Sequence, residues 1–181
     1  MSTTTMDRSA DFTARAPAVG SFFSRLIATT HSAAPTVSRL GLGGVMFAHG
    51  AQKVLGLWGG FGFSGTMGFM TKLGIPAPLA VLAILAEFLG SIGLITGLLT
   101  RVAAAGIAAV MIAAIVLVHA PFGFFMNWNG HQKAEGFEYH LLALTLCFAL
   151  MIAGGGRASI DRWLERRRTR SGAAPRPGRA A

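Results

Sequence analysis

Charged side chains are scarce in this sequence. Only 13% of its 181 residues are charged, whereas 52% are hydrophobic. Soluble domains carry about 25% charged residues, so the composition argues against an ordinary soluble domain and favours a protein of the lipid bilayer. The length suffices for a single domain.

Cysteine is almost absent as well. Cys147 is the only cysteine, which excludes an intramolecular disulfide, a C-x-x-C redox pair and a thiolate metal cluster. It lies in an apolar run, where we expect a small core residue. The N-terminal apolar runs are shorter than the roughly 7–15 residues of a secretory signal, so we expect no cleaved leader.

Basic residues outnumber acidic ones, and the net charge is +9. Residues 157–181 hold eight arginines and two acids. Arginines beside a last membrane helix are what orientation by cytoplasmic positive charge predicts, and they also attract anionic lipid. We therefore expect the lipid bilayer as a partner, and no nucleic acid.

The apolar runs predict an all-α membrane protein, a four-transmembrane-helix bundle with short interfacial helices at its N- and C-terminal ends. A helix needs about 20 mostly apolar residues to cross a bilayer. The predicted spans are residues 39–57, 77–99, 102–119 and 136–153, within a domain covering residues 36–156. Residues 1–35 are expected to be partly disordered, with an interfacial helix at 19–30, and residues 157–181 to form a basic tail that begins with an amphipathic helix.

Lysine and arginine positions predict the orientation. The connections 58–76 and 120–135 carry only Lys72 and Lys133, whereas Arg101 lies in the tight turn between the second and third spans and further arginines flank both ends. The positive-inside rule then predicts that both termini lie in the cytoplasm and the two connections outside.

Glu87 is the only ionisable residue between Lys72 and Arg101. A carboxylate in mid-membrane costs roughly 2.5–3.5 kcal/mol, so it should face protein or water and have a partner. His49 and Lys53 are four residues apart, share a helix face and fall at a similar depth. A Glu87 bond to either one is expected, and a purely structural role for that bond stays open.

Other polar groups are predicted in the same central and outer layers. They are His119, Glu138 and His140, together with Ser91, which lies one turn from Glu87 on the same face. Each has an ordinary alternative as an interfacial or helix-start residue. The sequence holds no serine nucleophile with a His/Asp relay and no phosphate loop, and no histidine pair at i, i+4 supports a metal, so we predict none. An amphipathic ligand such as a quinone suits the cluster better, because His and Glu can supply protons on its reduction.

The strings FAHGAQKVLG, EFLGSIGLITGLLTRVAA, EGFEYHLL and GGGRASID, in this order, resemble the DoxX family over residues 39–162. The resemblance implies a four-helix bacterial inner-membrane protein. The family name comes from a subunit of thiosulfate:quinone oxidoreductase, which implies quinone-linked redox chemistry beside a partner protein. By motif position the resemblance points to His49, Lys53, Glu87, Arg101 and His140. GGG stands where many relatives have G-P-G.

The resulting hypothesis is a membrane redox component that binds quinone or a related lipophilic molecule in an outer-half pocket. Glu87, His49 and Lys53 are the predicted catalytic residues. The predicted substrate-binding residues are His119, Glu138, His140, Ser91 and Arg101. Two alternatives are a non-catalytic assembly or scaffold subunit and a small ion- or proton-coupled transporter. A soluble or membrane redox partner protein and self-association both stay open.

Overall fold

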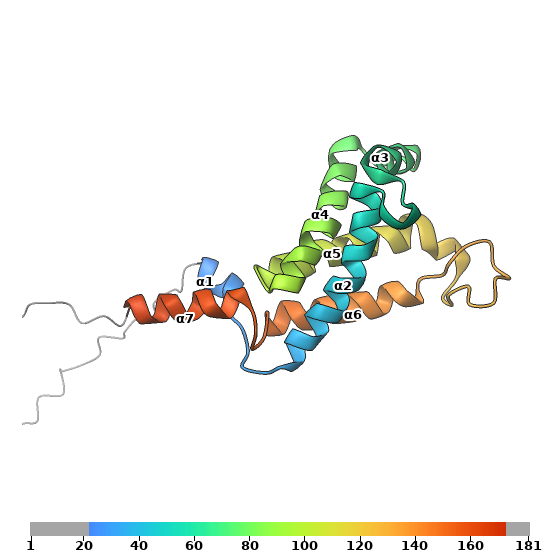
Figure 1. Cartoon of the computed structure of the whole chain (residues 1–181). Coiled ribbons are helices and arrows are strands. Elements are labelled where there is room, and N and C mark those ends of the chain that lie inside the picture. Colours follow the sequence, from blue (N-terminus) through green and yellow to red (C-terminus); the bar gives the residue numbers. More distant parts are fainter. Residues whose placement is uncertain (1–21, 173–181) are drawn as a thin grey trace, which may run out of the picture.

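The computed structural model describes residues 22–172, and among these there are helices and connections but no strand (Figure 1). The α-helices are α1 (Phe22–Ile27), α2 (Ala34–Leu55), α3 (Gly62–Lys72), α4 (Ala77–Thr96), α5 (Thr100–Ala114), α6 (Glu138–Ala153) and α7 (Ile160–Gly172). Short turns lie at Leu57–Gly59, Ile115–His119 and Ala120–Phe122. The all-helical prediction is confirmed. Residues 1–21 lie outside the described residues, and with them most of the segment expected to be partly disordered and the start of the helix expected at 19–30; so do residues 173–181 of the basic tail.

Four long helices form the body of the molecule. α2 packs against α4 and α6, and α5 packs against both α4 and α6. Their facing sides bury an apolar core. Its largest members are Leu42, Met46, Leu94, Ile107, Met111, Leu144 and Leu150, and Cys147 lies among them. α1 and α7 lie next to each other at one end, and the connection before α6 projects at the other (Figure 1).

Glycines permit the close packing of α2 on α4. A Cβ atom added at Gly50 would lie 2.8 Å from the Cα of Phe88, and one added at Gly43 would lie 3.0 Å from side-chain atoms of Leu94 and Ile95. Small residues let helix backbones approach in this way. The rings of Phe47 and Phe88 stack beside Gly50, with centroids 5.7 Å apart. This contact holds the helix that carries Lys53 against the one that carries Glu87.

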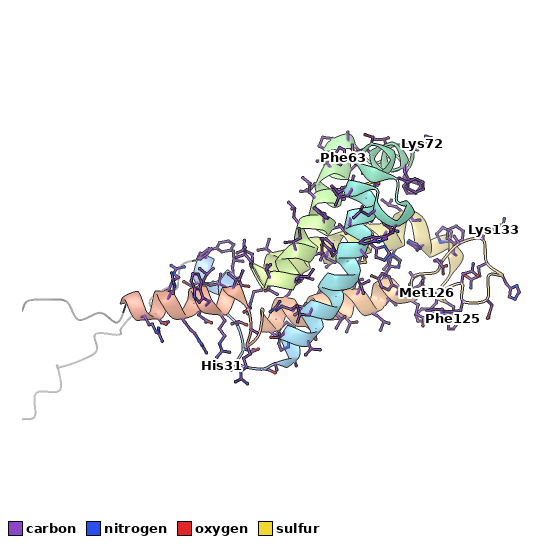
Figure 2. The ribbon with its side chains drawn as sticks, in the orientation of Figure 1. His31, Phe63, Lys72, Phe125, Met126 and Lys133 are labelled. Atoms are coloured by element: carbon purple, nitrogen blue, oxygen red, sulfur yellow. The ribbon has the colours of Figure 1, made fainter. Side chains whose placement is uncertain are left out.

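The outward faces of the helices are apolar. Leu82 of α4, Val116 after α5 and Ile152 of α6 are 63%, 66% and 78% exposed. Soluble proteins rarely expose large contiguous apolar surfaces, so these faces suit lipid. Figure 2 shows the side chains around the whole ribbon.

Within the described residues, two helical segments are long and apolar enough to cross a membrane, Ala77–Thr96 and Thr100–Phe122, with mean hydropathies of 2.2 and 2.5. The sequence led us to expect four such segments. α6 is apolar but has 16 residues, and at about 1.5 Å per residue it is shorter than the roughly 30 Å of a hydrocarbon core. α2 has 22 residues, but their composition is diluted by Arg39, His49 and Lys53.

The ends of the helices differ from the predicted spans in ways that local sequence explains. α2 begins at Ala34, with proline in its first turn, and ends where Gly56 adopts a positive φ of 70°. The helix after Arg101 changes to a π-helical turn at Ile115–His119. Such wide turns often occur at functional sites, and this one carries His119.

Arg39 and Asp161 fasten the turn between α4 and α5 from both sides. Arg39 is 2% exposed, and its guanidinium donates to the carbonyls of Leu94 at 2.8 Å and Ile95 at 2.5 Å and also to that of Ala158. Asp161 is 1% exposed and accepts the N–H groups of Leu99 at 2.7 Å and Thr100 at 2.9 Å. The cation thus meets the carbonyl end of α4 and the anion meets the amide end of α5, as the helix dipoles favour.

Candidate functional site

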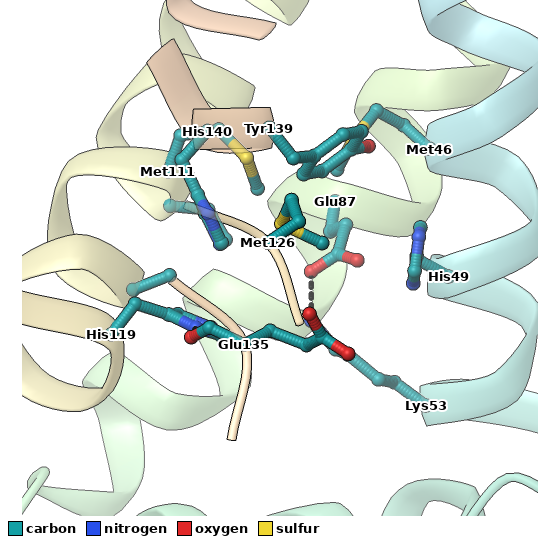
Figure 3. A pocket seen from close by; sticks show the side chains of 12 residues that line it. Met46, His49, Lys53, Glu87, Met111, His119, Met126, Glu135, Tyr139 and His140 are labelled. Atoms are coloured by element: carbon teal, nitrogen blue, oxygen red, sulfur yellow. Dashed lines mark hydrogen bonds and ion pairs between the residues drawn. The ribbon is translucent and has the colours of Figure 1, made fainter. Parts of the chain in front are cut away.

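A cavity of 310 Å³ lies among α2, α4, α5 and α6 and the connection before α6. We call it the head cavity. Figure 3 shows the side chains around it. It is lined by Met46, His49, Lys53, Glu87, Val110, Met111, Ala114, His119, Met126, Glu135, Tyr139 and His140. Five of the eight predicted site residues are therefore in its wall.

Lys53 and Glu87 form an ion pair across α2 and α4 (Figure 3). The Glu87 side chain is 1% exposed and that of Lys53 is 32% exposed. A buried carboxylate needs such a partner, because leaving it alone carries the full desolvation penalty. Lys53 keeps one side toward the cavity, so its ammonium has room to donate to a second acceptor. This is the predicted pairing, formed with Lys53, whereas His49 stands beside it in the same wall.

His119 and His140 face each other on another side of the head cavity. Their ring centroids are 4.2 Å apart. The Nδ1 atom of His119 lies 2.8 Å from the carbonyl oxygen of Glu135. His140 is 7% exposed, and its Nδ1 has no hydrogen-bond partner within the described part of the chain. A buried polar atom without a partner costs about 1–3 kcal/mol, so His140 brings an unused hydrogen-bonding nitrogen to the wall of the cavity.

Tyr139 completes the cavity wall between the Lys53–Glu87 ion pair and the His119–His140 ring pair. It is the only tyrosine in the chain. Its hydroxyl lies 3.4 Å from the sulfur of Met46, a weak acceptor that leaves the hydroxyl available for a better partner. Its ring lies 6.1 Å from that of His49 and 5.5 Å from that of His140, centroid to centroid. Tyr139 therefore connects the α2 and α6 sides of the site.

A second cavity of 280 Å³ adjoins the first. We call it the tail cavity. Its remaining lining is almost entirely apolar: Phe61, Thr66, Phe69, Met70, Leu73, Ile75, Ala83, Ala113, Leu117 and Val118. It shares Lys53, Val110, Ala114 and His119 with the head cavity. The two cavities therefore lie side by side at these four residues, one lined by several ionisable groups and the other mostly by apolar side chains.

Three predicted site residues do not line either cavity. The Ser91 hydroxyl donates to the carbonyl of Phe88 at 2.6 Å. A carboxylate oxygen of Glu138 accepts the backbone N–H of Met126 at 3.2 Å. Arg101 donates to the carbonyl of Ile152 at 2.9 Å. All three make local or packing contacts.

Seven residues of the head cavity were not among the predicted ones. They are Met46, Val110, Met111, Ala114, Met126, Glu135 and Tyr139. Tyr139 had a usable signal, since it is the only tyrosine and directly precedes His140. Met126 and Glu135 lie in an irregular connection, which has no periodicity from which a face could be read. Within residues 22–172, no group of three His, Cys, Asp or Glu side chains is arranged to hold a metal ion.

Comparison with known proteins identifies the family. The DoxX family model matches residues 34–120. The protein named Inner membrane protein YqjF, from Escherichia coli (strain K12), is 30% identical over 128 residues, which cover 68% of this chain and 94% of that protein. No solved structure matches the chain. The matched region contains α2 to α5 and with them the Lys53–Glu87 pair, and the protein is thus a membrane protein of the DoxX family.

Proposed function

We propose that the protein is an integral membrane redox component that binds a quinone or a related lipophilic molecule. The polar ring would occupy the head cavity and the apolar chain the tail cavity. One observation carries this proposal: the two cavities share Lys53 and His119, so an amphipathic molecule could occupy both at once. A purely polar ligand would leave the apolar tail cavity empty. A purely apolar ligand would cover the Lys53–Glu87 ion pair without giving it a polar contact.

The size and polarity of the head cavity support this ligand class. Small-molecule sites begin at about 300 Å³, and the head cavity measures 310 Å³. A quinone ring presents carbonyl oxygens on opposite edges. Lys53 offers donors on one side of the cavity, and His140 and Tyr139 offer ring and hydroxyl donors on another (Figure 3). The unpartnered Nδ1 of His140 is the kind of group that a ligand carbonyl would satisfy.

The protonatable groups have separate roles in this proposal. Reduction of a quinone to a quinol takes up two electrons and two protons, and the electrons would come from a partner protein. Lys53 donates a hydrogen bond from its ammonium and is held in place by Glu87. Lys53 would deliver protons to the quinone oxygens, and His49 and Tyr139, which line the same cavity, would in turn return protons to Lys53. Burial among helices excludes bulk water from Glu87.

We further propose that α2, α4, α5 and α6 all span the membrane, with both termini in the cytoplasm. Arginine-rich α7 supports the cytoplasmic assignment of its end of the bundle. The opposite end carries Lys72 and Lys133. On this orientation the head cavity opens in the outer half of the membrane, and the bacterial inner membrane is the proposed location.

The test is the quinone content of the purified protein. Its organic extract should contain more quinone than that of a control membrane protein purified in the same way. The excess should fall in Glu87→Leu and His140→Ala. Ser91→Ala is the matched control, because Ser91 is also buried in α4, one turn from Glu87, but lines neither cavity.

Three results would contradict the proposal. One is a quinone content no higher than that of the control protein, which an inert scaffold subunit would give. Another is ion flux in liposomes without quinone dependence, which would favour a transporter. The last is stoichiometric iron, copper or zinc that is lost in His49→Ala or His140→Ala.

A further inference from the structure

A pocket separate from the head and tail cavities lies at the end of the bundle where α7 begins. Residues of α4, of the connection before α7 and of α7 itself line it. It has a volume of 310 Å³. It is lined by Thr96, Arg157, Ala158, Ser159, Ile160, Arg162, Trp163 and Arg166. Three of its eight lining residues are arginines and none is acidic. We call it the arginine pocket.

The guanidinium of Arg162 is buried with few hydrogen-bond partners. It is 7% exposed, and its Nη2 lies 2.5 Å from the Nδ1 of His31. Its Nε and Nη1 are buried and have no hydrogen-bond partner among the described residues. A buried guanidinium is expensive unless an anion or several acceptors compensate it. One contact with an imidazole nitrogen does not supply that compensation.

The surrounding charges increase the cost of burying the Arg162 guanidinium without an anion. Arg166 lies one helical turn after Arg162, so the two side chains leave the same face of α7 and repel each other. Arg157 adds a third positive charge to the lining. Within residues 22–172, no carboxylate forms an ion pair with any of the three. Of the two acids in α7, Asp161 accepts the N–H groups of Leu99 and Thr100, and Glu165 does not line the pocket.

The surroundings indicate what kind of anion fits. Guanidinium groups bind phosphate oxygens through paired hydrogen bonds, which makes arginine the favoured residue for phosphate recognition. Ile160 and Trp163, also in the lining, are 39% and 50% exposed. α1 lies beside α7 and exposes Phe22 by 78%. Apolar and aromatic side chains next to arginines are typical of a surface that rests at the headgroup level of a membrane.

We propose that the arginine pocket binds a phosphate-type oxyanion, with the headgroup of an anionic phospholipid as the source that the adjoining apolar side chains favour. The phosphate would lie between Arg157, Arg162 and Arg166. Its oxygens would accept from the free guanidinium nitrogens of Arg162 after a small side-chain rotation. The bound anion would also secure α7 to the end of α4. This site is independent of the two cavities and of any quinone.

The test uses the full chain in detergent, with Trp58→Phe and Trp128→Phe so that Trp163 is the only remaining tryptophan. The fluorescence of Trp163 is followed during titration with short-chain phosphatidylglycerol, with phosphatidylcholine of the same chain length, and with inorganic phosphate. Phosphatidylglycerol should give a saturable change and phosphatidylcholine none. Loss of charged hydrogen bonds in Arg157→Gln/Arg166→Gln should weaken binding about tenfold or more.

Two variants sharpen the result. Arg162→Gln should also weaken binding. If this substitution of a buried residue disturbs folding, the test rests on Arg157→Gln/Arg166→Gln, because both of those arginines are exposed. Arg170→Gln is the matched control, because it removes the same charge from the same helix outside the pocket. A response to inorganic phosphate that Arg157→Gln/Arg166→Gln also weakens would support the site with a soluble source. The proposal is overturned if neither anion gives a saturable change, or if Arg170→Gln weakens binding as much as the pocket variants do.

Discussion

The ion pair between Lys53 and Glu87 predicts a large, specific loss of stability when the lysine is removed. In Lys53→Met the stem is replaced by a side chain of similar shape, and the carboxylate of Glu87, 1% exposed, loses its counter-ion. Removing one partner of a buried pair costs about 3–5 kcal/mol. Lys53 is 32% exposed, which places the expected loss at the lower end, about 3 kcal/mol.

The assay is thermal unfolding in one detergent at neutral pH. At about 2–4 °C per kcal/mol for a chain of this size, Lys53→Met should lower the melting temperature by about 6–12 °C. The double variant Lys53→Met/Glu87→Leu removes both charges and should recover most of that loss, because replacing a whole buried pair with apolar side chains is often neutral. Lys72→Met, an exposed lysine at the end of α3, is the matched control and should change little. Equal melting temperatures for Lys53→Met and wild type would refute the argument that Glu87 depends on this partner.

Three further predictions concern the packing and the orientation. Gly50→Ala should destabilise the protein by about 1–3 kcal/mol, because its Cβ would lie 2.8 Å from the Cα of Phe88. Gly44→Ala is the control: its Cβ would meet nothing within 4 Å, so the melting temperature should be unchanged or slightly raised. Equal effects of the two substitutions would contradict the close approach of α2 and α4. Asp161→Ala should cost about 0.5–2 kcal/mol by the loss of the cap on Leu99 and Thr100, measured by the same unfolding assay; an unchanged melting temperature would show that this cap contributes nothing. A reporter fused after Ala181 should be active in the cytoplasm, and periplasmic activity would overturn the proposed orientation.

Patterns within single helices made part of the site predictable. Glu87 was identifiable because it interrupts a long apolar stretch, and Lys53 because a lysine within an apolar segment needs a counter-ion. The spacing of His49 and Lys53 placed them on one helix face, and both line the head cavity. His119 and His140 were expected in the same layer, and their rings do face each other.

Contacts between distant segments were not predictable in the same way. Arg39 was predicted as the first residue of a span, yet its guanidinium is buried on carbonyls 55 and 116 residues away. No local pattern encodes such a contact, because it depends on how α4 and the glycine-rich turn before α7 come together. Ser91 shares the face of Glu87 along α4, but its hydroxyl bonds within its own helix, as serine often does.

The proposal that one amphipathic ligand occupies both cavities is tested most directly by photolabelling. A quinone with a photoreactive group on its apolar chain is bound to the purified protein, irradiated, and the labelled residues are identified by mass spectrometry. Label should appear at Phe69, Met70 or Leu117 in the tail cavity, should be displaced by unlabelled quinone, and should fall in Glu87→Leu. Label confined to the lipid-facing leucines of α4, such as Leu85 and Leu89, and undiminished by unlabelled quinone, would contradict it.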